Sequence, residues 1–264
     1  MMKIRVGIGG WNFPEWRGGF YPKGLNQKQE LSFAASKLNT IEINATYYGS
    51  QKPESFAKWH AETPQGFVFA VKGPRFATNR RVLADAEPSI AQFFASGVLN
   101  LKEKLGPINW QFSEYKKFEP DDFAKFIALL PKSVEGRPIQ HALEVRNAAF
   151  NDRDFIALAR AHDMAIVTSA DSDFPQINDV TAPFVYARIM GTKENEEQGY
   201  AKSDLKKWAA RASQWSQGQT PDGFETMALP GDGKPRDVFL YVISGAKAKN
   251  PHAAMGIMQH LAVA

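Results

Sequence analysis

The sequence predicts a single α/β domain over residues 1–264 that folds as a (β/α)8 TIM-type barrel with parallel strands. Short runs rich in β-branched and aromatic residues recur through the chain. Most of these runs are followed by a segment with the apolar spacing of a helix. Alternating strands and helices are typical of a parallel sheet covered by helices, and eight such units are the number that closes a barrel.

Eight segments are expected to form the strands. Each is a short apolar run of the composition that favours strands, and polar or turn-forming residues separate one run from the next. The predicted strands are residues 4–8, 40–44, 67–71, 108–112, 141–145, 164–168, 184–188 and 238–243.

The connecting segments supply seven predicted helices, several of which begin with Asp, Asn or Pro, as a helix N-terminus favours. Residues 170–183 are too short and too polar for a full sixth helix, so a doubly wound open sheet is the alternative architecture. Residues 193–199 and 218–237 are predicted to be surface loops. The predicted helices are residues 29–38, 53–61, 88–98, 121–130, 152–162, 202–217 and 251–261.

Composition excludes several classes of protein. The 264 residues, 44% of them hydrophobic, can bury about three quarters of the surface that the unfolded chain exposes. The net charge of +4 is milder than a dedicated nucleic-acid binder usually carries. The absence of cysteine excludes disulfides, thiolate-bound metals and a thiol nucleophile. The N-terminal residues lack the apolar region of a signal peptide, and the longest apolar run is too short to cross a bilayer, so we expect a cytoplasmic protein without membrane contact.

Polar side chains gather at the predicted C-terminal ends of the strands. In strand 40–44, Glu42 and Asn44 lie on one face and Ile41 and Ile43 on the other. The apolar face of a barrel strand packs against helices, so the polar face points into the mouth of the barrel, where barrel enzymes have their sites. The other polar residues placed there are Lys72, Gln111, Glu144, Arg146, Asp171 and Arg188.

Two interpretations of these charges remain open. In the first, Lys72, Arg146 and Arg188 only neutralise Glu42 and Glu144 in an internal ion-pair network. In the second, the three cations exceed the two carboxylates and bind a small phosphorylated or otherwise anionic ligand. The second interpretation predicts a binding protein or a metal-independent acid/base enzyme, a hydrolase or an isomerase among the options, with Glu42 or Glu144 moving the proton.

Loops are expected to complete the mouth. The glycines of residues 7–10 let the backbone approach it, and Trp11 either forms a stacking wall for a ligand or belongs to a small satellite core. Tyr47 follows the second strand. Lys247 precedes the last predicted helix, in the region where barrels often bind phosphate, unless it belongs to a solvated basic loop.

Neither a metal nor a cofactor is expected. None of the five histidines stands at the C-terminal end of a predicted strand, which disfavours a histidine-rich metal centre. A carboxylate-only Mg²⁺ site at Glu42, Glu144 and Asp171 would have to compete with the neighbouring lysine and arginine side chains.

Two further functions are alternatives. Arg75, Arg80 and Arg81 follow the third strand, and with aromatic residues such as Tyr48 they suggest binding or processing of nucleic acid, although such a cluster is more often a solvated loop. The pair Glu42 and Glu144 suggests glycoside hydrolysis, but strands two and five are expected to hold these residues far apart around the barrel.

The motifs also carry a resemblance. Residues 7–22, which begin Gly-Ile-Gly-Gly-Trp, and residues 38–48 are followed in order by blocks at 67–72, 105–111, 141–146 and 184–188. Together they resemble the YecE-like family, also called domain of unknown function 72, over nearly the whole chain. The resemblance implies a TIM-type barrel with no established activity. The chain departs from the family pattern after strand eight, where Val-Ile-Ser-Gly-Ala-Lys replaces a Phe-Asn-Asn-like segment, and at Asn147 and Ala148, which replace His-Pro.

Overall fold

The strands of the main sheet form a barrel. The computed structural model describes residues 3–228 and 230–263. The strands hydrogen-bond in the order β8-β7-β4-β3-β2-β1-β11-β10-β9, and each neighbouring pair is parallel. They are β1 (Ile4–Gly9), β2 (Thr40–Ile43), β3 (Val68–Lys72), β4 (Leu105–Gln111), β7 (His141–Glu144), β8 (Ala165–Ile166), β9 (Thr168–Ala170), β10 (Phe184–Ile189) and β11 (Asp237–Val242). The hairpin of β5 (Ser133–Val134) and β6 (Arg137–Pro138) lies apart from the main sheet.

Strands β8 and β9 are two halves of the predicted sixth strand. β8 pairs with β7 and β9 pairs with β10, so the single stretch from 165 to 170 joins the two ends of the sheet. Val167 between them still donates its backbone N–H to Leu143 at 3.0 Å. The predicted TIM-type barrel is therefore confirmed, and the open-sheet alternative is not the fold.

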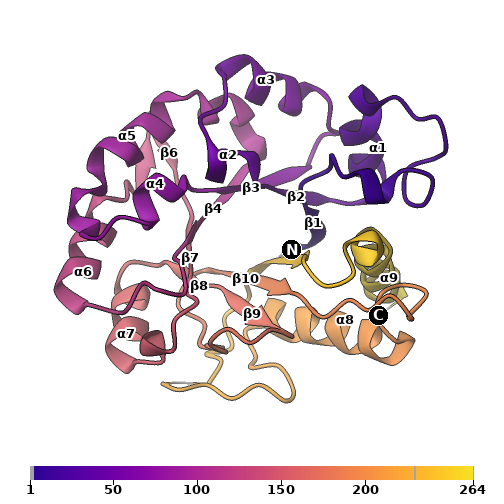
Figure 1. Cartoon of the computed structure of the whole chain (residues 1–264). Coiled ribbons are helices and arrows are strands. Elements are labelled where there is room, and N and C mark those ends of the chain that lie inside the picture. Colours follow the sequence, from indigo (N-terminus) through magenta and orange to yellow (C-terminus); the bar gives the residue numbers. More distant parts are fainter. Residues whose placement is uncertain (1–2, 229, 264) are drawn as a thin grey trace.

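Helices form a ring around the strands (Figure 1). Each of the seven predicted helices is present, with ends shifted by up to three residues. The four-residue helices α2 and α4 were not predicted, because one turn is too short to show a helical period. The helices are α1 (Glu30–Lys37), α2 (Ala45–Tyr48), α3 (Pro53–Ala61), α4 (Arg75–Thr78), α5 (Glu87–Ala95), α6 (Pro120–Leu129), α7 (Arg153–Ala161), α8 (Lys202–Ser216) and α9 (Asn250–Val263), with 3₁₀ turns at Pro14–Trp16, Gln27–Gln29, Leu83–Ala86, Val98–Lys104, Ala148–Phe150 and Lys247–Lys249.

A loop takes the place of the missing sixth helix. Every residue from 171 to 183 is described and none is helical, as the polar sequence predicts. The carboxylate of Asp179 accepts hydrogen bonds from the backbone N–H groups of Met227 and Ala228, both at 2.8 Å. These bonds hold the loop predicted at 218–237 against the barrel; position 229 of that loop lies outside the described residues.

The interior of the barrel is layered along its axis. At the N-terminal ends of the strands, which we call the lower half, Phe184 and Phe239 meet at 6.1 Å between ring centroids, next to Val68. The rings of Tyr186 and Tyr241 form the next layer, 5.1 Å apart. At the C-terminal ends, which we call the upper half, the side chains are charged. The boundary between apolar and charged packing therefore lies at the two tyrosines.

Glycines of β1 leave room for this upper half. A Cβ atom at Gly7 would lie 2.0 Å from the carbonyl oxygen of Thr40, and one at Gly9 would lie 2.9 Å from Nδ2 of Asn44. β1 therefore contributes close backbone packing and no side chain to the mouth, as the glycine-rich motif predicts.

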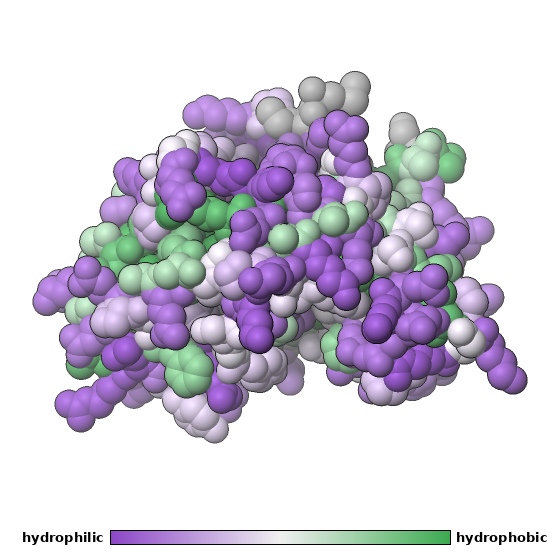
Figure 2. Space-filling view, turned by 90° about the horizontal axis from the view of Figure 1, so that it is seen from above, coloured by the Kyte–Doolittle hydropathy of each residue, from purple (hydrophilic) through white to green (hydrophobic). Residues whose placement is uncertain are grey.

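Hydrophilic side chains predominate on the face shown in Figure 2, and the hydrophobic ones gather mainly toward the left of that view. Within the described ranges 3–228 and 230–263, no helix is both long and apolar enough to span a bilayer.

Candidate functional site

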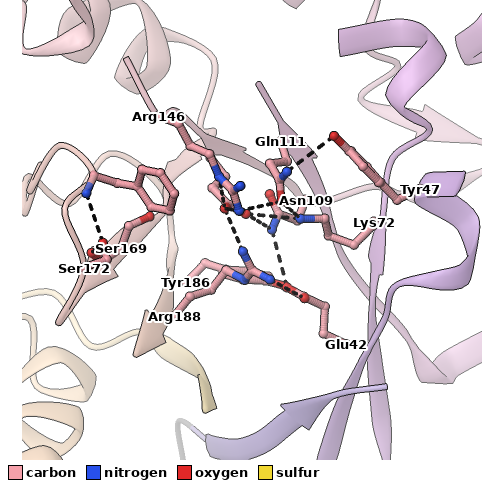
Figure 3. Close-up of polar contacts among 12 residues, drawn as sticks. Glu42, Tyr47, Lys72, Asn109, Gln111, Arg146, Ser169, Ser172, Tyr186 and Arg188 are labelled. Carbon is pink, nitrogen blue, oxygen red and sulfur yellow. Dashed lines mark hydrogen bonds and ion pairs between the residues drawn. The ribbon is translucent and has the colours of Figure 1, made fainter. Parts of the chain in front are cut away.

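The ends of five strands bring charged and polar side chains together inside the barrel. The register of neighbouring strands brings these residues side by side: Lys72 of β3 pairs with Asn109 of β4, and Gln111 of β4 pairs with Glu144 of β7. Figure 3 shows these side chains converging from different strands. This group, the mouth cluster, consists of Glu42, Lys72, Asn109, Gln111, Glu144, Arg146, Tyr186 and Arg188.

Glu144 is the centre of the mouth cluster and is fully buried. Its Oε1 accepts from Arg188 at 2.6 Å and from Arg146 Nη2 at 2.8 Å, while its Oε2 accepts from Asn109 at 2.9 Å and from Lys72 at 3.3 Å. Burial alone would raise the pKa of Glu144, but the charges of Arg188, Lys72 and Arg146 outweigh burial and hold that pKa well below its usual range. Glu144 is therefore ionised with both oxygens occupied, which disfavours a role in proton transfer.

Arg188 joins the two buried carboxylates. Its Nη2 donates to Oε1 of Glu42 at 3.0 Å while its Nη1 binds Glu144. The other oxygen of Glu42 accepts from the hydroxyl of Tyr186 at 2.5 Å and from Asn109 at 3.4 Å. Burial alone would lower the pKa of Arg188, but Glu144 and Glu42 outweigh it and raise that pKa above its usual value. The strands that hold Glu42 and Glu144 are separated by β3 and β4, as expected, but the two side chains cross the barrel interior and bind the same guanidinium.

Lys72 lies at the edge of the mouth cluster. Its Nζ donates to Oε1 of Gln111, which also accepts from Arg146 at 3.0 Å. The ring of Tyr47 lies 5.2 Å from Nζ, and the Tyr47 hydroxyl lies 3.4 Å from Nε2 of Gln111. Burial, helped by the positive charge of Arg188, lowers the pKa of Lys72 to about 8, although Glu144 and Glu42 act in the opposite direction. Lys72 is thus the member of the cluster that titrates nearest to neutral pH among those with a shifted pKa.

A pocket of about 330 Å³ opens on the C-terminal side of the mouth cluster. Its size suits a small metabolite. Glu42 and Glu144 do not line it, because both lie deeper and are fully buried. The residues that line the pocket are Gly9, Phe13, Trp16, Asn44, Tyr47, Tyr48, Lys72, Gln111, Arg146, Arg188, Ile243, Ser244, Lys247 and Asn250.

The structure places Asn44, Tyr47 and Lys247 in the wall of this pocket. The Lys247 ammonium lies 4.3 Å from the ring centroid of Phe13, another residue of the pocket wall. The loops after β10 and β11 are the region where a barrel often binds phosphate. There, the backbone N–H of Gly191 is already used, because it donates to the hydroxyl of Tyr200 at 2.8 Å.

Two of the predicted ligand-binding residues lie outside the pocket. Trp11 packs against Trp59 at 5.2 Å and Phe69 at 6.3 Å between ring centroids, which places it against the main hydrophobic core. Asp171 has a positive φ of 55°, and its carboxylate accepts from Tyr200 at 2.9 Å. Asp171 does not line the pocket and is paired with Tyr200, so it is not a third carboxylate beside Glu42 and Glu144.

Asn109 and Tyr186 belong to the mouth cluster but were not among the predicted site residues. A signal for both was present, because Asn109 shares a strand face with Gln111, and Tyr186 shares one with Arg188. Phe13 and Trp16 also line the pocket, but they lie in an irregular loop where no periodicity identifies the face of a side chain.

Carboxylates and histidines do not assemble into a metal centre in the described part of the chain: no group of three or more His, Asp or Glu there has a metal-binding arrangement. The predicted absence of a metal and of a cofactor stays a prediction.

Comparison with known proteins gives the chain a family. A family model described as "Protein of unknown function DUF72" matches residues 5–264. The chain is 23% identical to the UPF0759 protein YecE of Escherichia coli strain K12 over 242 residues, covering 83% of this chain and 84% of that protein. It is also 23% identical to the UPF0759 protein YunF of Bacillus subtilis over 219 residues, 76% of this chain and 73% of that protein.

Among solved structures, a DUF72 family protein from Thermotoga maritima superposes with a TM-score of 0.74 at 20% sequence identity, covering 98% of this chain and 99% of that one. At this identity the structural likeness speaks for the fold alone. Because the family model covers nearly every residue, the protein belongs to the YecE-like DUF72 family.

Proposed function

We propose that this protein binds a small anionic ligand, a phosphorylated compound in particular, in the pocket at the mouth of its barrel. The observation that carries the proposal is the arrangement of charge: Arg146, Lys72 and Lys247 line the pocket, whereas the two acids of the mouth cluster lie behind them and do not reach it. An anion in the pocket would meet positive groups first.

The positive groups differ in how free they are to bind. Both terminal nitrogens of Arg188 are already paired with Glu42 and Glu144. The side chain of Arg146 is 25% exposed; its Nε and Nη2 bind Glu144 and Gln111, so Nη1 is the nitrogen we assign to the ligand. We therefore assign the main anion contacts to Arg146 and Lys247, with Lys72 below them, and assign to Arg188 the neutralisation of the buried acids.

The aromatic wall supports a ligand with an organic part. Phe13 and Tyr47 line the pocket beside the cations, and ring faces of this kind contact an apolar or carbohydrate surface while the cations hold the charge. A phosphorylated sugar or a similar small metabolite combines both features.

A thermal-shift titration tests the proposal with inorganic phosphate, glucose 6-phosphate and, as the neutral comparison, glucose. Glucose 6-phosphate and phosphate are expected to raise Tm, since a ligand at about 100 times its Kd stabilises the folded state by about 2.7 kcal/mol. Glucose is expected to have no effect. Equal stabilisation by glucose, or no stabilisation by either phosphate compound, would contradict the proposal.

Arg146→Met is the matched variant for this titration. Loss of a charge-assisted hydrogen bond is expected to weaken phosphate binding at least tenfold, because such bonds contribute about 1.5 to 3 kcal/mol. Arg153→Met, the same change at an exposed position of α7, is expected to bind as the wild type does. Equal affinity of both variants would remove Arg146 from the anion site.

A second candidate function rests on the surface beside the pocket. Tyr48 and Phe76 are exposed large aromatic side chains, and the Arg75 guanidinium lies 5.8 Å and 5.5 Å from their ring centroids. Alternating arginine and aromatic groups can bind single-stranded nucleic acid through stacking and phosphate contacts. A short single-stranded DNA added to the same titration distinguishes the two functions: stabilisation by DNA that Tyr48→Ala removes would favour this alternative over a small ligand.

A further inference from the structure

Lys72 combines burial with a place in the pocket wall. Its side chain is 3% exposed, and the residue is one of those that line the pocket. It stands at the C-terminal end of β3, in the layer where barrel enzymes place their reactive groups. Its surroundings are two guanidinium groups, one carboxylate at 3.3 Å and the ring of Tyr47.

The second buried lysine of the described chain, Lys104, shows what a structural role looks like. Its Nζ donates to the carbonyl oxygens of His60 and Thr63, both at 2.6 Å, and to the hydroxyl of Thr63 at 3.1 Å. Three oxygen acceptors use all three hydrogens of the ammonium group. Burial also lowers the pKa of Lys104, but its amine is fully occupied by protein atoms. Lys72 has one firm acceptor, Gln111, and one longer contact with Glu144.

We propose that Lys72 forms an imine with the carbonyl group of a small anionic aldehyde, ketone or oxo acid bound in the pocket. The inference rests on the proposed anion site and names the substrate class for it. Arg146 and Lys247 hold the anionic group in the outer part of the pocket, and the carbonyl carbon then lies toward Lys72 at its inner end. The step makes the protein a carbonyl-processing catalyst rather than a binding protein alone.

The balance of the step is simple. The Lys72 ammonium releases one proton to solvent, its nitrogen attacks the carbonyl carbon, and a C–N bond forms. The C–O bond then breaks and the oxygen leaves as water. The leaving oxygen takes one hydrogen from the nitrogen and one proton from solvent, which replaces the proton released at the start. The ammonium and the carbonyl compound therefore yield a protonated imine, whose nitrogen keeps one hydrogen, and water. No oxidant or reductant is needed, and the released water leaves through the open side of the pocket.

The neutral amine required for attack is available near neutral pH. With the pKa of Lys72 at about 8, roughly one molecule in ten carries the neutral amine at pH 7, against fewer than about one in a thousand for an ordinary lysine. Glu144 remains ionised and stabilises the positive charge of the imine, as it stabilises the ammonium in the empty protein. Such desolvated lysines are the usual form of an amine nucleophile.

Reductive trapping tests the proposal. The protein is incubated with dihydroxyacetone phosphate or pyruvate and cyanoborohydride, which reduces imines to stable amines, and the adduct is located by mass spectrometry of peptides. One adduct per chain at Lys72 is expected, formed at least ten times faster than at Lys206, an exposed lysine of α8. Lys104 is expected to stay unmodified, because burial without access to the pocket does not make an amine reactive. Labelling of Lys72 no faster than that of Lys206 would overturn the proposal.

Competition keeps the test independent of any variant. Inorganic phosphate is expected to slow the labelling of Lys72 and not that of Lys206, and the Lys72 labelling rate should rise as the pH approaches about 8, where half of its amine is neutral. Lys72→Met should abolish the single adduct. Stabilisation by phosphate without an adduct would overturn the imine and leave the anion site standing. An adduct that forms equally with uncharged dihydroxyacetone and is indifferent to phosphate would overturn the anion site and leave the reactive lysine standing.

Discussion

Phe184, Phe239 and Val68 fill the lower half of the barrel interior, whereas Glu42, Glu144 and Arg188 fill the upper half. Both halves are almost completely excluded from solvent. The lower half needs only matching volume, since apolar side chains tolerate replacement by others of similar size. The upper half needs every partner, because a buried charge that loses its counterion is strongly destabilising.

The difference shows what each half is for. An apolar layer would have closed the upper half at lower electrostatic cost, because replacing a buried ion pair with apolar residues is often neutral or stabilising. The charges are instead placed directly beneath a pocket, and the lower half carries no comparable opening lined by charged groups in the pockets of the described chain. The barrel interior therefore consists of an apolar lower half and a charged upper half that lies directly beneath the pocket.

The largest expected effect comes from Arg188→Met. The substitution leaves Glu42 with only Tyr186 and Asn109 as partners and takes one of the cations from Glu144. We expect the free energy of unfolding of the empty protein to fall by about 3 to 5 kcal/mol, measured by urea denaturation at pH 7.

Phe239→Leu is the control in the lower half. A replacement that nearly keeps apolar volume should cost less than about 1.5 kcal/mol. A loss below about 1 kcal/mol for Arg188→Met, together with weaker phosphate binding, would instead show that Arg188 grips the ligand and that the acids do not depend on it.

The second prediction concerns pH and Lys72. The pKa of this lysine is lowered to about 8 in the folded protein and is near 10.5 when the chain is unfolded, so the unfolded state binds more protons between these two values. Stability contributed through Lys72 therefore rises as pH rises from about 8 to 10.5, by up to about 3 kcal/mol. Urea denaturation across this range should show the wild type gaining stability relative to Lys72→Met, in which this titration is absent. Parallel pH profiles for the two proteins would be the contrary result.

Much of the upper half could be predicted from residue alternation alone. Within one strand, the two-residue period decides which side chains face inward, and Glu42, Lys72, Gln111 and Arg188 were placed in the mouth on that basis. Residue alternation gives no information about distances across the barrel. Glu42 and Glu144 come from strands that are not neighbours in the sheet, and the side chains of Arg188 and Asn109 link them by binding both carboxylates.

Loops were less predictable than strands, for reasons visible at two residues. Trp11 follows a strand, but the ring of Trp59 on α3 determines where it packs, and no local pattern encodes that contact. Asp171 follows β9 by one residue, but its carboxylate accepts a hydrogen bond from Tyr200, a contact that no local pattern encodes. The fold itself was predictable because eight strand segments and seven helices each have their own periodicity, which does not depend on long-range contacts.

The smallest expected effect compares two stacked tyrosines at the boundary between the halves. The Tyr186 hydroxyl donates to the carboxylate of Glu42 at 2.5 Å, whereas the Tyr241 hydroxyl lies 2.8 Å from the hydroxyl of Thr40, which itself donates to the carbonyl of Val68. A hydrogen bond to a charged group contributes about 1.5 to 3 kcal/mol and one between neutral groups about 0.5 to 1.5 kcal/mol. Tyr186→Phe should therefore lower the free energy of unfolding by about 1 kcal/mol more than Tyr241→Phe, which removes the same atom in the same layer. Urea denaturation of both variants at pH 7 measures the difference. Equal losses would mean that the charged layer does not extend down to Tyr186, and that Arg188 and Asn109 alone satisfy Glu42.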